Sequence, residues 1–414
     1  MDLTLVNLME ARNFVTAREM IEFGNWLLPT MNGEPRIAKP PLPTWQTAAL
    51  IGISGTAKNL FLLRLPAVFA AIILVLSLYF FIIYSGGSKV QALVCSSVLA
   101  TTVIMLQMGR IGSWDVHCHA WLMAGLASWM FYRNKATEKT VPLLLTILFF
   151  SFSFYSKGPV SFYTLLLPFI IASLFAGSKK WKDIPIATYV LISIAVLLIS
   201  AAWPLYVHLH AADAGQEVVA AETTAWMNRH VKPFYFYLNF PLFMGIWIPF
   251  TVAVFIWKYA SSKILEYKFI VIWTIASLVL LSVIPEKKDR YLLPMIVPLS
   301  ILVGSLVSFC ISHGGDQTHR SLKRIHMILC VLIIVSALSI TVYFGILVGQ
   351  LSVVVTVLSI IVFTALACLL LRWRKTFARV FIISLLTVYA VNTLLLPLST
   401  QFLYPNKNYR SMSV

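Results

Sequence analysis

Residues suited to binding a phosphate occur in five short polar stretches of a chain that is otherwise strongly apolar. Lysine offers a compact positive charge, and arginine offers two parallel donors that match a phosphate group. The basic and aromatic candidates are Arg12, Lys39, Lys157, Arg229, His230, Lys287, Lys288, Arg290 and Tyr291. Two acidic residues, Glu10 and Asp115, belong to the same stretches. Together these groups predict a site for a phosphate or pyrophosphate.

Lys39 lies in a stiff segment of the first polar stretch, "RIAKPPLPTW". Pro40, Pro41 and Pro43 fix φ and remove backbone donors, so the segment is extended and rigid. Such a loop holds a lysine in one place without further ordering cost. The alternative is a lysine that merely reaches the membrane surface beside a proline-rich start of a helix.

Asp115 is the only carboxylate between Glu34 and Glu138, and it stands at the start of an apolar segment. An acid in that position costs energy unless it is hydrated or paired with a cation such as Arg110. His117 and His119 are two residues apart and point to different faces of a helix. We therefore expect at least one of them only to pack at the membrane interface, and not to form half of a metal site.

The elements that must position these residues are membrane helices. The chain is 59% hydrophobic and 11% charged with a mean hydropathy of +0.86, whereas soluble domains carry about a quarter charged residues. Apolar segments long enough to cross a bilayer lie near 59–84, 90–108, 117–132, 141–156, 160–177, 184–209, 238–257, 269–284, 291–312, 326–348, 351–371 and 380–398. Their length and uniform hydrophobicity predict helices and not barrel strands. The expected fold class is an all-α polytopic integral membrane protein of about twelve transmembrane helices.

The distribution of Lys and Arg predicts the orientation. Short connections such as "RNKATEK" and "RWRKTFAR" carry about three basic residues each, which indicates the cytoplasmic side. Residues 1–58, the loop 210–237 and the C-terminal tail then lie outside. The net charge of +17 is mostly a topology signal, and no nucleic-acid partner is expected.

The basic residues of the outer turns break this rule. Lys157 lies in "YSKGPV", and Lys287, Lys288 and Arg290 lie in "PEKKDRYLLP", although tight turns need no lysine. With the basic residues of the outer loops they predict an outward-facing basic basin at the membrane surface. Ionisable side chains are almost absent within the spans, whereas a proton-coupled transporter usually keeps some there.

The first loop contains a predicted interfacial helix, "EARNFVTAREMIEFGNWLLP". Phe14, Ala17 and Ile21 share one face, and Arg18 and Glu22 pair at i,i+4 on another. Gly24 is the expected C-cap and Pro29 the stop. Solvated charges are the expectation for Arg18, Glu19 and Glu22, whereas Glu10 and Arg12 fit that interpretation less well.

Aromatic residues accompany the basic cluster of "ETTAWMNRHVKPFYFYLNF". Aromatic faces can stack on sugars, but Trp226 and Tyr235 are more typical of the aromatic belt at a membrane interface. The five cysteines have spacings that suit neither zinc nor a disulfide framework, so we expect small buried apolar residues.

Three regions follow from this pattern. Residues 1–58 form a first extracytoplasmic loop with interfacial helices, 59–398 a transmembrane helical domain, and 399–414 an outer tail. Twelve spans place both ends outside, yet residue 1 follows no cleavable signal. We therefore expect a span missing before residue 1, and a tail that begins a truncated further domain.

These stretches, in this order, resemble the membrane glycosyltransferases of the GT-C class. The resemblance is strongest to the bacterial aminoarabinose transferase (ArnT-like) branch, which is related to protein O-mannosyltransferases. It runs from about Glu10 to Tyr409 and rests on "EARNFVTAREM", "GNWLLPTMNGEPRIAKPPLPTW", "SKGPV", "HVKPFYFY" and "KKDRYLLP". It implies a GT-C-like bundle with interfacial helices in the first outer loop, in a family with thirteen spans and often an outer C-terminal domain.

The resemblance also implies roles for particular residues. Lys39 matches the family lysine that meets phosphate, Asp115 the acid at the outer end of its span, and Arg12 the arginine after the first-loop acid. Glu10, Asp115 and Lys39 are then the catalytic candidates, and the remaining basic residues and Tyr291 would bind substrate. Met9 and Ala38 stand where the family commonly has acidic residues. A metal bridging to His230 is therefore not expected, and neither is any other cofactor.

The implied activity is transfer of a sugar, such as aminoarabinose, from a polyprenyl-phosphate carrier to a lipid or glycan acceptor. That acceptor is lipid A or another envelope glycan, at the periplasmic face of a bacterial inner membrane among membrane lipids. Two alternatives remain. A lipid-linked-saccharide flippase would need a polar path through the spans, which the sequence does not contain. An inactive membrane scaffold is favoured by Met9 and Ala38.

Overall fold

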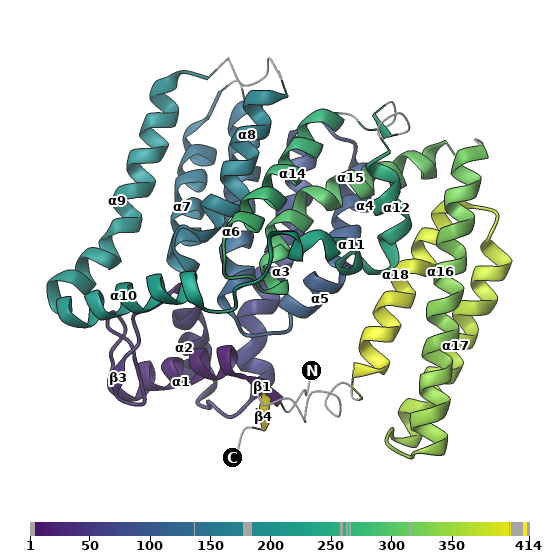
Figure 1. The fold of residues 1–414 in the computed structure, drawn as a ribbon, viewed down its shortest axis with the longest axis horizontal. Coiled ribbons are helices and arrows are strands. Elements are labelled where there is room, and N and C mark those ends of the chain that lie inside the picture. The colour runs from purple at the N-terminus through teal and green to yellow at the C-terminus, as the bar shows by residue number, and fades with distance from the viewer. Residues whose placement is uncertain are drawn as a thin grey trace.

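The structure is a computed structural model that describes residues 5–135, 137–176, 184–256, 260–261, 264, 266–313, 317–396, 398 and 409–411. It is a helical bundle with a layer of shorter elements at one end (Figure 1). The longer helices of the bundle are α3 (Leu60–Tyr84), α6 (Trp114–Asn134), α7 (Thr140–Lys157), α9 (Ile186–His210), α14 (Tyr267–Val283), α15 (Leu293–Ser312), α16 (Gln317–Val342), α17 (Val353–Trp373) and α18 (Phe377–Leu394).

Every one of the twelve predicted apolar segments is largely helical where the structure describes it. Seven helices of the described chain are long and apolar enough to cross a membrane, and a bent pair would make an eighth. The chain is therefore a multi-pass membrane protein. Shorter apolar helices occupy other predicted segments, among them a π-helix (Phe162–Leu166) that continues into α8 (Leu167–Phe175).

Two predicted segments are broken. The segment near 90–108 divides into α4 (Lys89–Ala100) and α5 (Val103–Met108), and Thr102 between them has an extended backbone. The segment near 238–257 holds a 3-10 turn and α11 (Phe240–Phe243), then a second turn and α12 (Ile248–Val254), with a bend of 94° between the halves. The Trp247 indole donates to the Thr101 hydroxyl at 2.9 Å, which joins the two breaks.

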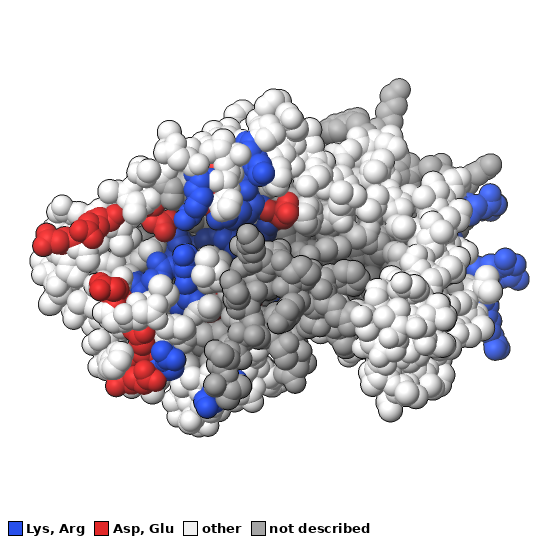
Figure 2. Space-filling model, turned by 60° about the horizontal axis from the view of Figure 1, so that its bottom comes forward, with Lys and Arg blue, Asp and Glu red and all other residues white. Residues whose placement is uncertain are grey.

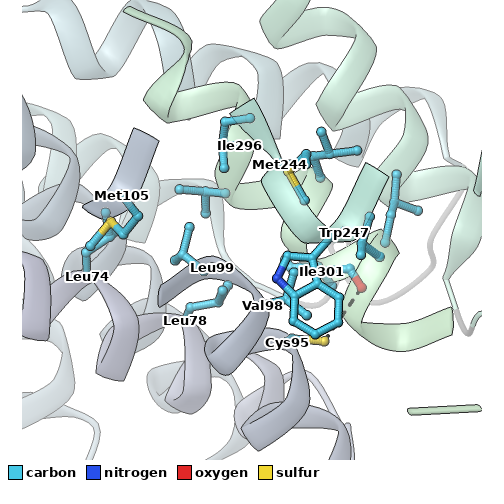
Figure 3. Close-up of a cluster of buried hydrophobic side chains, with 14 of the residues drawn as sticks. Leu74, Leu78, Cys95, Val98, Leu99, Met105, Met244, Trp247, Ile296 and Ile301 are labelled. Carbon is cyan, nitrogen blue, oxygen red and sulfur yellow. Dashed lines mark hydrogen bonds between the residues drawn. The ribbon is translucent and has the colours of Figure 1, made fainter. Parts of the chain in front are cut away.

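The core extends through the bundle, and one part of it lies where α3, α4, α5 and α15 meet (Figure 3). Leu78, Leu99 and Trp247 are fully buried there among aliphatic and methionine side chains. Gly304 of α15 lies so close to Cys95 of α4 that an added Cβ would lie 2.4 Å from the cysteine Cα. This close packing fixes α4, and through it the short helix α5 beside the end of the bundle that carries the layer of short elements.

Short elements form the layer at that end of the bundle (Figure 1). They are β1 (Leu5–Asn7), α1 (Leu8–Phe23), the hairpin of β2 (Thr30–Met31) and β3 (Glu34–Pro35), α2 (Leu42–Ser54) and α10 (Ala212–Asn228). Strand β4 (Tyr409–Ser411) pairs antiparallel with β1. The first loop therefore contains two helices, α1 and α2, and their position at a membrane interface stays a prediction.

Helix α1 agrees with its sequence pattern except on one face. Asn7 and Glu10 form a capping box, and Gly24 ends the helix with φ of 73°. Phe14 and Ala17 are buried, but Ile21 is 40% exposed, so the predicted apolar stripe is shorter than expected. The predicted Arg18–Glu22 pair is present at 3.4 Å.

Candidate active site

A cavity of about 1360 Å³ lies between this layer of short elements and the ends of the bundle helices. Figure 2 looks onto the same face and shows Lys and Arg side chains gathered beside Asp and Glu. Ten of the eleven predicted site residues line the cavity, namely Glu10, Arg12, Lys39, Asp115, Lys157, Arg229, His230, Lys288, Arg290 and Tyr291. Lys287 does not line it, because this buried lysine turns back and donates to the Ile284 carbonyl at 2.6 Å.

Asp115 lies in the first turn of α6 and pairs with two cations. Its carboxylate accepts a hydrogen bond from Lys157 at the end of α7, and its second oxygen is 3.4 Å from Nε of Arg290. The expected partner Arg110 is not part of this group; its guanidinium instead donates to the Asn392 side chain at 3.4 Å. The carboxylate is only 2% exposed, so the two cations compensate for the cost of burying it.

Tyr291 forms a wall of the same group. The Lys157 ammonium lies 4.8 Å from its ring centroid, and the Arg290 guanidinium lies 5.5 Å from it. Such cation–π contacts hold both cations in place without neutralising them. Two cations against the one Asp115 carboxylate leave this group with an excess of positive charge.

Glu10 is buried and holds three elements together. Its carboxylate accepts from Arg64 Nε at 2.8 Å, from the Gly112 amide at 2.9 Å and from the Asn7 amide at 3.2 Å. Arg64 is 3% exposed and lies in the second turn of α3. Both carboxylate oxygens are thus occupied, so the geometry suits Glu10 to positioning.

Lys39 faces the cavity from the first loop and pairs with Glu222 of α10 at 3.1 Å. Burial lowers the pKa of Lys39 below its usual value, although Glu222 opposes the shift. Arg36 and Arg12 line the same region, and the buried Nε of Arg36 has no hydrogen-bond partner among the described residues. Burial and the charge of Arg12 also lower the pKa of Arg36 below its usual value, although Glu222 opposes the shift.

A third group surrounds Glu286, which lies in the turn before Arg290. Its carboxylate accepts from Lys288 at 2.6 Å and from Arg229 at 3.2 Å. Burial raises the pKa of Glu286, but these two cations outweigh it and hold the pKa below its usual value. Val231 forms a β-bridge with Glu286, which ties the loop after α10 to this turn.

The hairpin before Lys39 is held by Glu19, contrary to the expectation of a solvated charge. Glu19 is 3% exposed and accepts from the Thr30 hydroxyl at 2.7 Å, the Asn32 amide at 2.5 Å and the Gly33 amide at 3.3 Å. Burial raises the pKa of Glu19, but these hydrogen bonds outweigh it and lower the pKa. The residue fixes the hairpin that leads directly to Arg36 and Lys39.

The remaining sequence-based expectations have mixed outcomes. His117 and His119 are both buried, and His119 lines the cavity. Tyr235 is 57% exposed, whereas the side chain of Trp226 lies outside the described residues. Four cysteines are buried as expected, but Cys368 is exposed on the surface of α17.

Cavity residues that the sequence reasoning missed fall into two classes. Arg64 lies inside a predicted span, where a charged residue is itself a signal of function. Arg36, Glu222 and Glu286 lie in polar stretches where nothing in the spacing distinguishes them from solvated residues. Only the fold brings Glu222 next to Lys39.

The lining carries nine Lys and Arg side chains and five Asp and Glu side chains, which leaves an excess of positive charge. The three buried carboxylates are each bound by at least two donors. Chemically, the arrangement is suited to binding anions and to stabilising negative charge that develops on a leaving group.

Two family models match the chain, one on each side of α10. Residues 10–213 match the dolichyl-phosphate-mannose-protein mannosyltransferases, and residues 229–367 match the Alg9-like mannosyltransferase family. A relative from Pectobacterium atrosepticum, the undecaprenyl phosphate-alpha-4-amino-4-deoxy-L-arabinose arabinosyl transferase, is 26% identical over 72% of this chain and 54% of its own length. An uncharacterized protein from Aquifex aeolicus is 23% identical over 80% of this chain and 64% of its own length. The chain thus spans roughly half to two thirds of the length of these relatives.

Solved structures agree with this relationship. ArnT from Cupriavidus metallidurans in the apo state superposes with a TM-score of 0.70 at 17% identity, over 97% of this chain and 75% of its own. The same protein bound to undecaprenyl phosphate also gives a TM-score of 0.70, at 16% identity and the same coverage. The sequence and the fold of the chain are thus similar to those of membrane glycosyltransferases of the GT-C class, ArnT among them.

Proposed function

We propose that the chain transfers a sugar from a polyprenyl-phosphate carrier to an acceptor at the outer face of a bacterial inner membrane. The observation that carries the proposal is the cavity at the outer end of the bundle, where Lys39, Arg36 and Arg12 adjoin the Asp115–Lys157 pair. The relatives' names support an aminoarabinose-type sugar, and the ArnT structure with undecaprenyl phosphate supports the carrier.

The cations would bind the phosphate of the donor. Lys39 supplies a point charge from a rigid loop, and the two arginines offer paired donors. As the bond between sugar and phosphate breaks, negative charge develops on the carrier phosphate, and fixed cations lower the barrier. Glu222 would have to release Lys39 when the phosphate arrives.

The carboxylates would position the cations of the cavity and would not deprotonate the acceptor. Glu10, Asp115 and Glu286 each hold at least two donors, so none is free to take a proton without losing an ion pair. This arrangement favours an acceptor that is already ionised, such as a lipid A phosphate, over a neutral hydroxyl. Asp115 would then hold Lys157 and Arg290 beside the incoming sugar.

The proposed topology has twelve spans with the cavity on the periplasmic side. The basic cytoplasmic connections support this orientation. We also propose that transfer requires no metal, since Ala38 replaces the acid that would bridge to His230 in the family pattern. Activity of the purified protein should accordingly be the same with and without a chelator such as EDTA.

The deciding experiment is mass spectrometry of envelope lipids from cells that lack the gene and from complemented strains. The strains would carry the intact protein, Lys39→Ala, or Lys58→Ala as a matched control. Lys58 is an exposed first-loop lysine outside the cavity. The proposal requires that deletion and Lys39→Ala both remove one sugar and cause a polyprenyl-phosphate sugar to accumulate, whereas Lys58→Ala restores the pattern. Identical lipid profiles in all strains would refute it.

A further inference from the structure

Arg110 is a cation of the cavity that no ion pair explains. It follows α5 in the loop Gly109–Ser113 and is half-buried, and its guanidinium reaches only the neutral amide of Asn392, at 3.4 Å. No carboxylate within the described part of the chain pairs with it. Burial lowers the pKa of Arg110 below its usual value.

The contrast with the other cavity cations is clear. Arg64 pairs with Glu10, Lys39 with Glu222, and the remaining paired cations with Asp115 or Glu286. Arg12 and Arg36 also have no ion pair among the described residues, but Arg36 adjoins Lys39 and Arg12 adjoins Arg36. Arg110 is therefore a separate positive centre, and a partly buried charge without a partner is costly unless a ligand supplies one.

The loop that carries Arg110 is fixed from two sides. The Gly112 amide donates to Glu10 at 2.9 Å, and the Gly112 carbonyl accepts from the Asn13 side chain at 3.2 Å. Asn13 is itself held by Thr44 and Thr47 of α2. The same loop ends at Ser113, which directly precedes α6 and Asp115. A rigid loop thus joins Arg110 to the centre of the cavity.

The walls around Arg110 combine amide and apolar groups. Gln107 of α5 and Asn392 of α18 line the cavity beside it, and both can donate hydrogen bonds to an anion. Val103 and Leu106 of α5 provide an apolar surface in the same cavity. An anionic headgroup with attached acyl chains fits this combination.

We propose that Arg110, Gln107 and Asn392 bind the anionic headgroup of the acceptor lipid, at a site separate from the carrier-phosphate site of Lys39, Arg36 and Arg12. The inference rests on the proposed function and deepens it, because transfer between two lipids requires both headgroups in one cavity. The acceptor headgroup would sit on the Arg110 side of Asp115, and the donor phosphate on the Lys39 side.

The test compares Arg110→Gln with Arg36→Gln in the purified full chain in nanodiscs. Binding is measured with two probes, undecaprenyl phosphate and diphosphoryl lipid A, and phosphatidylglycerol serves as a general anionic lipid. Loss of one charge-assisted contact should weaken binding about 10- to 100-fold. Arg110→Gln should weaken the binding of diphosphoryl lipid A and change the Kd for undecaprenyl phosphate by no more than about twofold. Arg36→Gln should have the reverse effect on the two lipids. Arg110→Lys should recover part of the loss, and thermal unfolding checks that each variant is folded.

Several results would overturn the inference. Arg110→Gln could weaken undecaprenyl phosphate as much as lipid A, which would assign Arg110 to the donor site. Unchanged binding of lipid A would show that Arg110 does not bind the acceptor. An equal loss of phosphatidylglycerol binding would mean that the site is a general contact for anionic lipids. If the intact protein transfers no sugar, the proposed function fails, and the two-probe binding experiment still decides whether Arg110 binds an anionic headgroup.

Discussion

At the scale of single residues, the cavity is a set of buried acids, each surrounded by cations. Asp115 and Glu286 each pair with two basic side chains, and Glu10 pairs with Arg64 and two backbone amides. Burying a charge is costly, and opposite charges at hydrogen-bond distance offset that cost. The acids therefore fix the positions of the cations, and the cations carry the affinity for phosphate.

The Glu10–Arg64 pair should show this dependence in its stability. Arg64→Met leaves the Glu10 carboxylate buried without its main partner, and the expected loss is about 3–5 kcal/mol of unfolding free energy. The double variant Arg64→Met with Glu10→Gln should be more stable than Arg64→Met alone, because no unpaired charge remains.

Lys135→Met removes a largely exposed pair and should change stability by less than about 1 kcal/mol. Thermal unfolding in detergent measures all three, and equal losses for Arg64→Met and Lys135→Met would contradict this account.

Lys39 should make donor binding depend on pH in a predictable direction. Only the protonated ammonium attracts phosphate, so binding is strong below the pKa of Lys39 and weakens as pH rises through it. Burial lowers that pKa, so donor binding should be lost at a lower pH than with an ordinary lysine. Glu222 raises the pKa, so Glu222→Gln should move the loss lower still.

The measurement is the Kd for undecaprenyl phosphate between about pH 7 and pH 10. Lys39→Arg is the control, because a guanidinium stays protonated throughout this range. Its profile should be flat. The same alkaline loss in Lys39→Arg would show that another group is responsible.

Sequence reasoning identified eight of the fourteen charged residues that line the cavity, but not how they pair. Lys39, Asp115, Lys157 and Arg290 were recognisable because charged residues at an outer membrane boundary have few structural reasons to be there. Arg110 was one candidate partner for Asp115, and the structure does not pair them. The actual partners come from the end of α7 and from the 3-10 turn Asp289–Leu292 before α15, and no local pattern encodes that proximity.

At the scale of elements, α1 positions the first loop and the hairpin before Lys39. Glu19→Gln should weaken three hydrogen bonds to this hairpin and cost about 1.5–3 kcal/mol of unfolding free energy. Donor affinity should fall as well, because Arg36 and Lys39 follow the hairpin. The matched control is Glu22→Gln on the same helix, whose exposed pair with Arg18 is worth about 0.3–0.5 kcal/mol.

Acid should remove the difference between Glu19→Gln and the parent protein. The folded-state pKa of Glu19 lies below its usual value, so its contribution is complete above the usual pKa and is lost as pH falls through the lowered one. Thermal unfolding at neutral and acidic pH measures the difference. If the difference in stability between the parent protein and Glu19→Gln stays constant down to strongly acidic pH, the carboxylate charge does not hold the hairpin.

At the scale of the whole molecule, the apolar segments predicted the helices well. Hydropathy detects a buried or lipid-facing segment by its length and composition, and all twelve segments are largely helical where they are described. The breaks at Thr102 and before Gly245 were not predictable, because both segments remain apolar through the break. Whether each broken segment still crosses the membrane depends on its surroundings in the bilayer.

Cysteine labelling distinguishes the possible topologies. In a background without the five native cysteines, single cysteines replace the exposed residues Lys58, Lys139, Lys232 and Lys375. Twelve spans place Lys58 and Lys232 outside, and Lys139 and Lys375 inside. A membrane-impermeant maleimide should therefore label the first two in intact spheroplasts and the last two only after lysis.

If the broken segment of α4 and α5 does not cross, positions 58 and 139 will label alike. If the bent segment of α11 and α12 does not cross, positions 232 and 375 will label alike. Labelling of position 58 only after lysis would place the first loop, and the cavity that it covers, on the cytoplasmic side.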